Sequence, residues 1–273
     1  MELRTKVDVQ VSAHPLSHAD DRILLLGSCF TDAVGTRLRR DGFNVCVNPF
    51  GPIFNPDSVL RALRYIKREE KPDVSLGFPD VEAVHFPFNR LIVTLGTARV
   101  FCRVTDNAIV ANCRRRPATE FRQRRMGVAE TAGVLGEILA EMPETLFTVS
   151  PMRHPDPAGL HGNNLNKSVL LLAVEEVGAQ YFPAYEALLD DLRDYRFTAA
   201  DMRHPSDVAV DYIYELFGKA FFRPCDRERI LACRAFSVLK AHRPSDPETH
   251  TRTVEEARKK LIAQYGIFPE TYC

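Results

Sequence analysis

The sequence contains no tryptophan, carries no net charge, and has no apolar stretch near the roughly 20 residues that a membrane-spanning helix needs. Its 36 lysines and arginines are balanced by 36 acidic residues, so we expect neither nucleic acid nor a membrane surface as a partner. We interpret the basic runs at 114–116 and 122–125 as solvated surface, typically a helix face. Because no apolar leader follows the first residues, we expect no signal peptide and a cytoplasmic protein.

Several familiar site motifs are also missing. The seven cysteines include no C-x-x-C pair, which argues against a zinc ribbon or a redox dithiol. The sequence has no G-x-S-x-G, no H-E-x-x-H and no P-loop. Histidines 85, 154, 161 and 204 are not spaced as metal ligands. We therefore expect no metal and no cofactor.

What the sequence does contain is a series of short, continuous apolar runs, each ending at a polar or glycine turn. Such runs are typical of strands buried on both faces of a parallel sheet. Strands and helices alternate, which predicts an α/β domain over residues 1–225. We expect a helical C-terminal extension, 226–273, packed on it. The predicted strands are 23–26, 43–47, 91–95 and 146–149, with a hairpin at 99–104 and 109–112; the predicted helices are 31–40, 58–67, 127–141, 168–177, 184–194 and 206–220, and 151–167 is expected to be a polar loop.

Candidate site residues follow from this sheet, because ligands of open α/β sheets bind at the carboxyl ends of the strands. The first buried strand leads directly into Gly27-Ser28-Cys29-Phe30, a turn that opens a helix. Backbone N–H groups at a helix N-terminus can stabilise an oxyanion and favour a thiolate.

A nucleophile in this turn needs a base, and the segment from Asp201 to Ser206 offers one. Asp201 and His204 stand three residues apart, so the carboxylate can fix the tautomer of the imidazole while the other ring nitrogen faces the nucleophile. Ser206 is then placed to cap the helix that follows.

With these residues in place, the chain resembles the GSCFA family, which is grouped with the SGNH/GDSL hydrolases. The name motif stands at Gly27-Ser28-Cys29-Phe30, with Thr31 in place of the usual Ala. Further similar segments follow in order: Asn48-Pro49-Phe50-Gly51, Thr94-Leu95-Gly96-Thr97-Ala98, Asn112-Cys113, Ser150 to His154 and Asp201 to Ser206. The resemblance implies a three-layer flavodoxin-like fold and acyl-ester chemistry.

The resemblance leaves two candidates for the nucleophile. The spelling of the motif suggests Ser28, whereas alignment with a G-D-S-L stretch places Cys29 at the nucleophile position. A cysteine is chemically competent, since its thiolate is a strong nucleophile and His204 can deprotonate it. The alternative is that Cys29 packs beneath a catalytic Ser28.

The resemblance also implies an oxyanion hole and a polar substrate site. Gly51 fits the glycine of the hole, but the family's asparagine position holds Ala98 in the Gly96-Thr97-Ala98 segment. Loss of such a donor costs about 3 kcal/mol in the transition state. Thr97, Asn112 or Asn163 can replace it. His154, Asn163 and Lys167 are expected to bind a polar substrate such as a sugar or a carboxylate.

The sequence thus predicts an acyl-ester hydrolase acting through an acyl-enzyme on a polar ester, such as a carbohydrate or small acyl ester. An acyltransferase or thioesterase would use the same intermediate. Two other hypotheses are a small-ligand binding protein that has lost efficient catalysis, suggested by Ala98, and a phosphate-binding protein using the Gly27 turn. The oligomeric state is not indicated.

Overall fold

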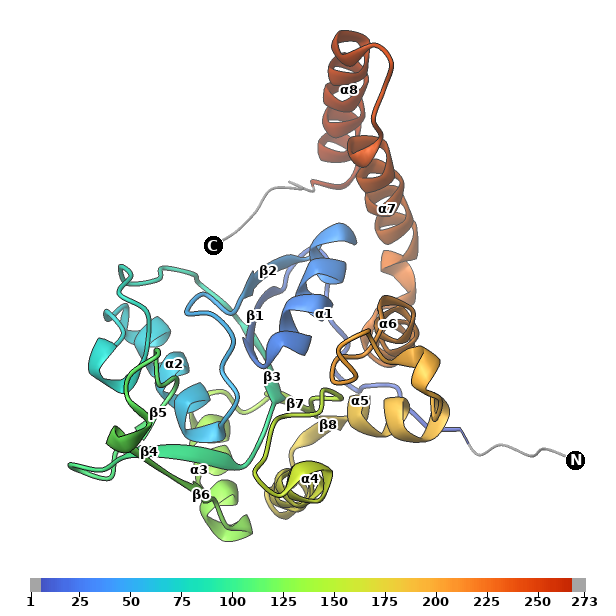
Figure 1. Cartoon of the computed structure of the whole chain (residues 1–273). Helices are drawn as coiled ribbons and strands as arrows, with labels where there is room; N and C mark the ends of the chain where they lie inside the picture. Colours follow the sequence, from blue (N-terminus) through green and yellow to red (C-terminus); the bar gives the residue numbers. More distant parts are fainter. Residues whose placement is uncertain (1–5, 267–273) are drawn as a thin grey trace, which may run out of the picture.

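A computed structural model describes residues 6–266. At its centre lies one sheet of five parallel strands, β1 (Arg22–Gly27), β2 (Asn44–Val47), β3 (Arg90–Leu95), β7 (Leu146–Val149) and β8 (Gln180–Phe182), in the order β2-β1-β3-β7-β8 (Figure 1). This is the strand order of flavodoxin-like folds. Gly27 lies opposite Thr94 in the register of β1 and β3. The predicted parallel sheet is confirmed, and β8 is a short edge strand that the sequence did not predict.

Helices cover both faces of this sheet, so the domain has three layers. One face packs against α2 (Pro56–Arg68), α3 (Val128–Glu141) and α4 (Gly159–Glu176). The other packs against α1 (Cys29–Arg40) and α6 (Asp207–Phe221). Alternate residues of β1 enter the two cores, with Leu24 and Leu26 on one side and Ile23 and Leu25 on the other. This two-sided burial is why the strand is a continuous apolar run.

The segment after β3 forms a second, smaller antiparallel sheet of β5 (Ile109–Val110), β4 (Arg99–Arg103) and β6 (Phe121–Arg125), in that order. The predicted hairpin is confirmed as β4 and β5. The expectation of a helix face at 122–125 is wrong, because these residues pair with β4 as a strand. Two short 3₁₀ turns are also present: η1 (Val74–Leu76) precedes β3, and η2 (Ala118–Glu120) lies between β5 and β6.

Helix α4 begins at Gly159, nine residues before the predicted start at 168, so the prediction of a loop over 151–167 is wrong for its second half. The inward face of this first part carries Asn163, Asn166 and Lys167, all buried. A polar inward face has no apolar periodicity, which is the signal used to find helices in sequence. Two predicted site residues, Asn163 and Lys167, therefore sit on a helix.

Between β8 and α6 the chain forms several short turns. They are α5 (Ala184–Glu186), a π-helical turn η3 (Ala187–Asp191) and a 3₁₀ turn η4 (Tyr195–Phe197). Ser206 caps α6, accepting the N–H of Ala209 at 3.3 Å, as predicted.

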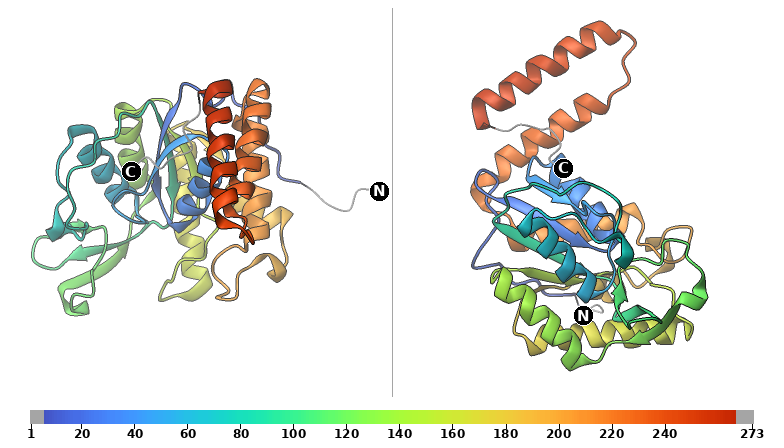
Figure 2. Two further views of the ribbon diagram at one scale, coloured as in Figure 1. Left: turned by 90° about the horizontal axis from the view of Figure 1, so that it is seen from above. Right: turned by 90° about the vertical axis from the view of Figure 1, so that its left-hand side faces the viewer.

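The chain then passes through η5 (Pro224–Asp226) into two long antiparallel helices, α7 (Arg227–Ala241) and α8 (Pro247–Tyr265), which project from the domain (Figures 1 and 2). Helix α7 is fastened by Asp41 at the end of α1: Arg234 donates Nε and Nη2 to its carboxylate at 2.8 and 2.6 Å. Helix α8 lies beside α7, away from the sheet (Figure 2). Over residues 6–266, we find no helix long and apolar enough to cross a membrane.

Candidate active site

The turn between β1 and α1 is fixed by a close approach of two strands. Gly27 has a φ of +142°, and a Cβ there would lie 2.2 Å from the carbonyl oxygen of Thr94. Only glycine fits this position. The same carbonyl accepts the N–H of Ser28 at 3.1 Å. The turn is thereby held against β3, at the carboxyl edge of the sheet.

Ser28 is the N-cap of α1. Its Oγ accepts the N–H of Phe30 at 3.3 Å, and the residue is 0% exposed. A buried cap of this kind stabilises the start of a helix by about 1 kcal/mol. Ser28 is therefore committed to the fold of the turn.

Cys29, by contrast, is the first residue of α1 and is partly exposed as a free thiol. Its Sγ donates to Met152 Sδ at 3.0 Å. Burial raises the pKa of the Cys29 thiol, and the Asp32 carboxylate raises it further. The N–H groups of Cys29 and Phe30 and the Lys167 ammonium act against this and favour the thiolate.

Asn48 ties the loop after β2 to this turn; the sequence places it only in the family-like segment Asn48 to Gly51 and predicts no role for it. Its Oδ1 accepts the N–H of Gly27 at 2.9 Å, and its Nδ2 donates to Asp32 Oδ1 at 2.9 Å. The residue adopts a left-handed φ of 42°. An asparagine before proline at the end of a strand was the available signal, since asparagine tolerates this conformation.

The predicted pair of Asp201 and His204 is formed. Asp201 Oδ2 hydrogen bonds to His204 Nδ1, while its Oδ1 accepts the backbone N–H groups of His204 and Arg203, each at 3.0 Å. These backbone bonds, with the histidine side chain, hold the pKa of Asp201 well below its usual range. The carboxylate is thus ionised and fixes the imidazole with Nδ1 toward it and Nε2 free to face elsewhere.

Two contacts bring this pair toward Cys29. The loop after β7 carries Met152, which touches the thiol, and then Arg153, whose N–H donates to the carbonyl of Arg203 at 3.0 Å. The loop after β7 therefore lies between the turn with Cys29 and the turn with His204.

His154, in the same loop, is buried with its ring edge against Phe54 at 5.2 Å between centroids. Burial lowers the pKa of His154 to about 2, with the positive charges of Lys167 and His204 contributing. It is neutral at pH 7. Within residues 6–266 its Nε2 has no hydrogen-bond partner. Asn163 Oδ1 accepts the backbone N–H of His154 at 3.0 Å, so Asn163 positions this loop.

Lys167 reaches the site from α4 and is 1% exposed. Its Nζ donates to the carbonyls of Gly96 at 2.6 Å and Ser150 at 2.8 Å, which directly follow β3 and β7. Burial lowers the pKa of Lys167 to about 7, and a Cys29 thiolate would raise it. Lys167 is thus a buried amine whose charge acts on the candidate nucleophile.

A family model described as the GSCFA family matches residues 22–85 and 78–217, the segment that carries this whole arrangement. The chain belongs to the GSCFA family. No curated protein matches it.

Solved structures similar to this GSCFA chain include esterases of low sequence identity. The psychrotrophic esterase EstA from Pseudoalteromonas sp. is 14% identical, with a TM-score of 0.42, and the match covers 74% of this chain and 96% of that one. An α/β hydrolase enzyme from the metagenome of Lake Arreo, Spain, is 13% identical, with a TM-score of 0.46 and coverage of 75% and 96%. An acetylxylan esterase from Geobacillus stearothermophilus is 12% identical, with a TM-score of 0.42 and coverage of 76% and 98%. Resemblance at this level does not define the activity.

The backbone donors predicted for an oxyanion hole in this GSCFA protein are already engaged. Gly51 donates its N–H to the carbonyl of Asn48 at 2.7 Å. Gly96 and Thr97 donate theirs to the carbonyl of Phe54 at 3.0 and 2.9 Å. Gly51 or Thr97 would have to release its bond to serve an oxyanion. The N–H groups of Cys29 and Phe30, at the start of α1, lie beside the thiol.

Asn112 follows β5, and no hydrogen bond to the turn with Cys29 is found for it among the described residues. It is exposed after β5, and its Oδ1 accepts the N–H of Arg114 at 2.8 Å. Asn112 and Gly51 line one pocket together with aromatic and arginine side chains. No group of three or more potential metal ligands occurs among the described residues.

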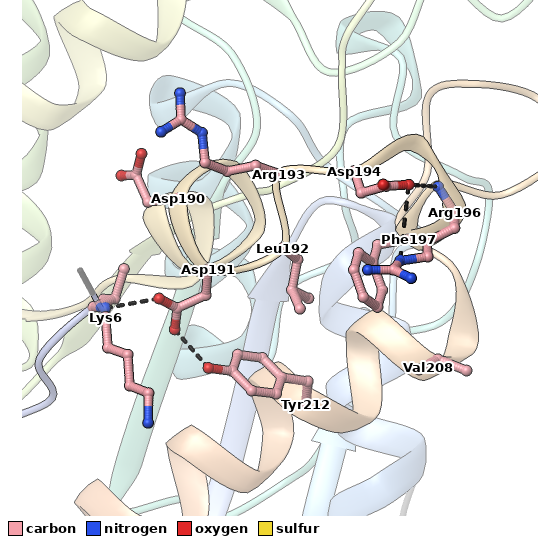
Figure 3. Close-up of a pocket in the computed structure, with 11 residues that line it drawn as sticks. Lys6, Asp190, Asp191, Leu192, Arg193, Asp194, Arg196, Phe197, Val208 and Tyr212 are labelled. Atoms are coloured by element: carbon pink, nitrogen blue, oxygen red, sulfur yellow. Dashed lines mark hydrogen bonds and ion pairs between the residues drawn. The ribbon is translucent and has the colours of Figure 1, made fainter. Parts of the chain in front are cut away.

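A larger pocket, about 950 Å³, contains none of the predicted site residues. It lies between the N-terminal segment, η3 and α6 (Figure 3). Asp191 accepts the N–H of Val7 at 2.8 Å and the hydroxyl of Tyr212 at 2.6 Å there. These bonds join three segments of the chain, so the polar residues of this pocket have a structural role.

Proposed function

We propose that this GSCFA protein is an acyl-ester hydrolase that forms an acyl-enzyme at Cys29, with His204 as the base and Asp201 as the residue that orients it. The observation that carries the proposal is the contrast within the turn: Cys29 presents a partly exposed thiol, whereas Ser28 is buried as a helix cap. A nucleophile has to reach its substrate, and of the two residues only Cys29 is partly exposed and can do so without breaking the cap of α1.

In the proposed reaction His204 Nε2 takes the thiol proton and the Cys29 sulfur attacks the ester carbonyl carbon. The tetrahedral intermediate collapses, the alcohol leaves with the proton from His204, and a thioester at Cys29 remains. His204 then removes a proton from water, whose oxygen attacks the thioester and releases the acid and the thiol. The N–H of Cys29, at the start of α1, can stabilise the developing oxyanion, whereas the N–H of Phe30 is bonded to Ser28 Oγ.

The charges around Cys29 support this chemistry. The ionised Asp201 stabilises a positive imidazole at His204, as carboxylates do in catalytic triads. The ammonium of Lys167 favours the thiolate. A substrate with a polar acyl or sugar group is compatible with a site built from histidine, lysine and asparagine side chains, and the same acyl-enzyme would serve a thioesterase or an acyltransferase.

A second candidate is a binding protein that retains the site without efficient turnover. The observation in its favour is that the N–H groups of Gly51 and Thr97 are already bonded within the loops. Losing oxyanion donors costs about 10²-fold to 10³-fold in rate per donor.

The test is a panel of acyl esters and thioesters with wild type, Cys29→Ala, Ser28→Ala and His204→Ala. We expect Cys29→Ala and His204→Ala to lose at least about 10³-fold in kcat, and Ser28→Ala to retain turnover. Cys225→Ala is the matched control, since Cys225 is an exposed free thiol on η5, away from the turn. Full activity in Cys29→Ala with loss in Ser28→Ala would make Ser28 the nucleophile, and no turnover by wild type on any ester would favour the binding protein.

A further inference from the structure

The pocket that contains Gly51 adjoins the turn with Cys29. Its walls are the loop 50–53, residues 77–78 and the segment 111–115, and its volume is about 390 Å³, within the range of small-molecule sites. Ile53 lines this pocket and donates its N–H to the carbonyl of Gly27 at 2.8 Å. The wall of the pocket is therefore hydrogen bonded to the residue that begins the catalytic turn.

One side of this pocket is aromatic and rigid. Phe50 and Phe78 are buried side by side at 6.0 Å between ring centroids, edge to face, and Tyr65 packs against both at 6.3 and 5.3 Å. Interlocked edge-to-face rings give a wall that does not collapse into an empty space. The apolar part of a substrate can lie against it.

The other side carries positive charge without a matching negative charge. No aspartate or glutamate is among the lining residues, whereas Arg114 and Arg115 both are. Arg114 uses its Nε on the carbonyl of Gly77 at 2.9 Å. Among residues 6–266, no hydrogen bond or ion pair is found for the Arg115 guanidinium.

This lack of acidic partners distinguishes the pocket from its surroundings. Most other arginines of the small sheet and its loops pair with a carboxylate, and the remaining two, Arg122 and Arg125, bind amide oxygens. The carboxylate pairs are Arg99 with Asp156, Arg103 with Asp106, Arg116 with Glu120 and Arg124 with Glu130. In a chain without net charge, two arginines left on a pocket wall are available to an anion from outside.

The backbone that holds these arginines is unusual. Arg114 and Arg115 adopt consecutive left-handed conformations, with φ of 47° and 59°. Such conformations are unfavourable for side chains other than glycine, asparagine and aspartate, and they concentrate at ligand sites. Gly77 permits the turn, because a Cβ there would lie 1.9 Å from the carbonyl oxygen of Asn112.

We infer that this pocket binds an anionic group of the substrate, a carboxylate or a phosphate, through Arg114 and Arg115, with the apolar part of the substrate against Phe50 and Phe78. Guanidinium groups bind both anions in paired hydrogen bonds, and a neutral sugar ester offers nothing to match two cations. The inference rests on the proposed function and narrows its substrate class to anionic acyl esters or thioesters.

Binding is measured by calorimetry on full-length Cys29→Ala, the variant that is expected to lose turnover. The probes are monoethyl suberate against diethyl suberate for the carboxylate, and hexyl phosphate against hexanol for the phosphate. We expect at least one anion to bind about tenfold or more tightly than its neutral partner. Arg115→Gln should remove most of this preference, while Arg122→Gln on β6, outside the pocket, should preserve it. Circular dichroism verifies that each variant is folded.

Equal binding of the charged and neutral probes, or a preference that survives Arg114→Gln together with Arg115→Gln, would overturn the inference. If wild type then still hydrolyses neutral esters through Cys29, the proposed function stands without this pocket. If the anionic probes bind through Arg115 but wild type hydrolyses no ester, the pocket is a ligand site and the proposed function fails.

Discussion

Replacing Lys167 with methionine should change how the stability of this protein depends on pH. Lys167 is 1% exposed, and burial lowers its pKa from 10.5 to about 7. Between these two values the unfolded chain binds a proton that the folded protein does not bind. The free energy of unfolding therefore rises with pH, by up to about 1.4 kcal/mol per pH unit. Below pH 7 the lysine is charged in both states, and the cost of burying this charge lowers the free energy of unfolding by its full amount.

The methionine variant removes this titration but also leaves the carbonyls of Gly96 and Ser150 without their donor. That loss costs about 1–3 kcal/mol per group and does not depend on pH. The quantity to compare is thus the slope of stability against pH, measured by urea unfolding in a Cys29→Ala background, where the neighbouring thiol no longer titrates. From about pH 7.5 to about pH 9, we expect the lysine protein to gain about 2 kcal/mol relative to Lys167→Met.

Lys240→Met is the control, because Lys240 is exposed on α7 and stays in water in both states. Its slope should match that of the parent protein. Parallel slopes for Lys167→Met and the parent would refute the reasoning, since they would show that Lys167 titrates alike in the folded and unfolded chains.

Three other changes have expected outcomes. Gly27→Ala should reduce the free energy of unfolding by about 3 kcal/mol or more, because the new Cβ meets β3 backbone at 2.2 Å in a left-handed conformation; a smaller loss in urea unfolding would contradict the packing at this turn. Asp41→Ala should cost about 2–4 kcal/mol, because the buried hydroxyl of Tyr214 loses its acceptor and Arg234 of α7 loses its carboxylate; a thermal unfolding temperature that hardly shifts would show that these bonds do not hold α6 and α7 in place. Asp201→Asn should lower kcat about 10³-fold to 10⁴-fold with little change in KM, because His204 loses its fixed tautomer; less than a tenfold loss would exclude the proposed role.

The sheet could be predicted from the sequence because strands that are buried on both faces appear as continuous apolar runs. Runs such as 23–26 are apolar at every position, and the turns that follow them lie at the carboxyl edge as expected. The contact between Asp201 and His204 was equally accessible, since three residues on one loop suffice to form it.

Other parts of the fold and of the site have no comparable pattern in the sequence. The first turns of α4 bury Asn163, Asn166 and Lys167, so the helix faces the sheet with polar side chains and shows no apolar period. Strand β6 is mostly charged and half exposed, so nothing in its composition separates it from a solvated helix. The full burial of Lys167 depends on two carbonyls at the ends of separate strands, which only the folded sheet brings together.

In the first turn of α1, the adjacent residues Ser28 and Cys29 have different roles: one caps the helix and the other is the candidate nucleophile. A helix cap has to fold its side chain back toward the backbone, and Ser28 does this with Oγ on the N–H of Phe30. Attack by that hydroxyl would require breaking the cap, about 1 kcal/mol, and leaving a fully buried place. Cys29 pays no such cost, because its sulfur already lies outside the cap and beside the helix N–H groups. Ser28→Ala should therefore lower the free energy of unfolding while turnover is retained. Cys29→Ala should abolish turnover while the free energy of unfolding is retained.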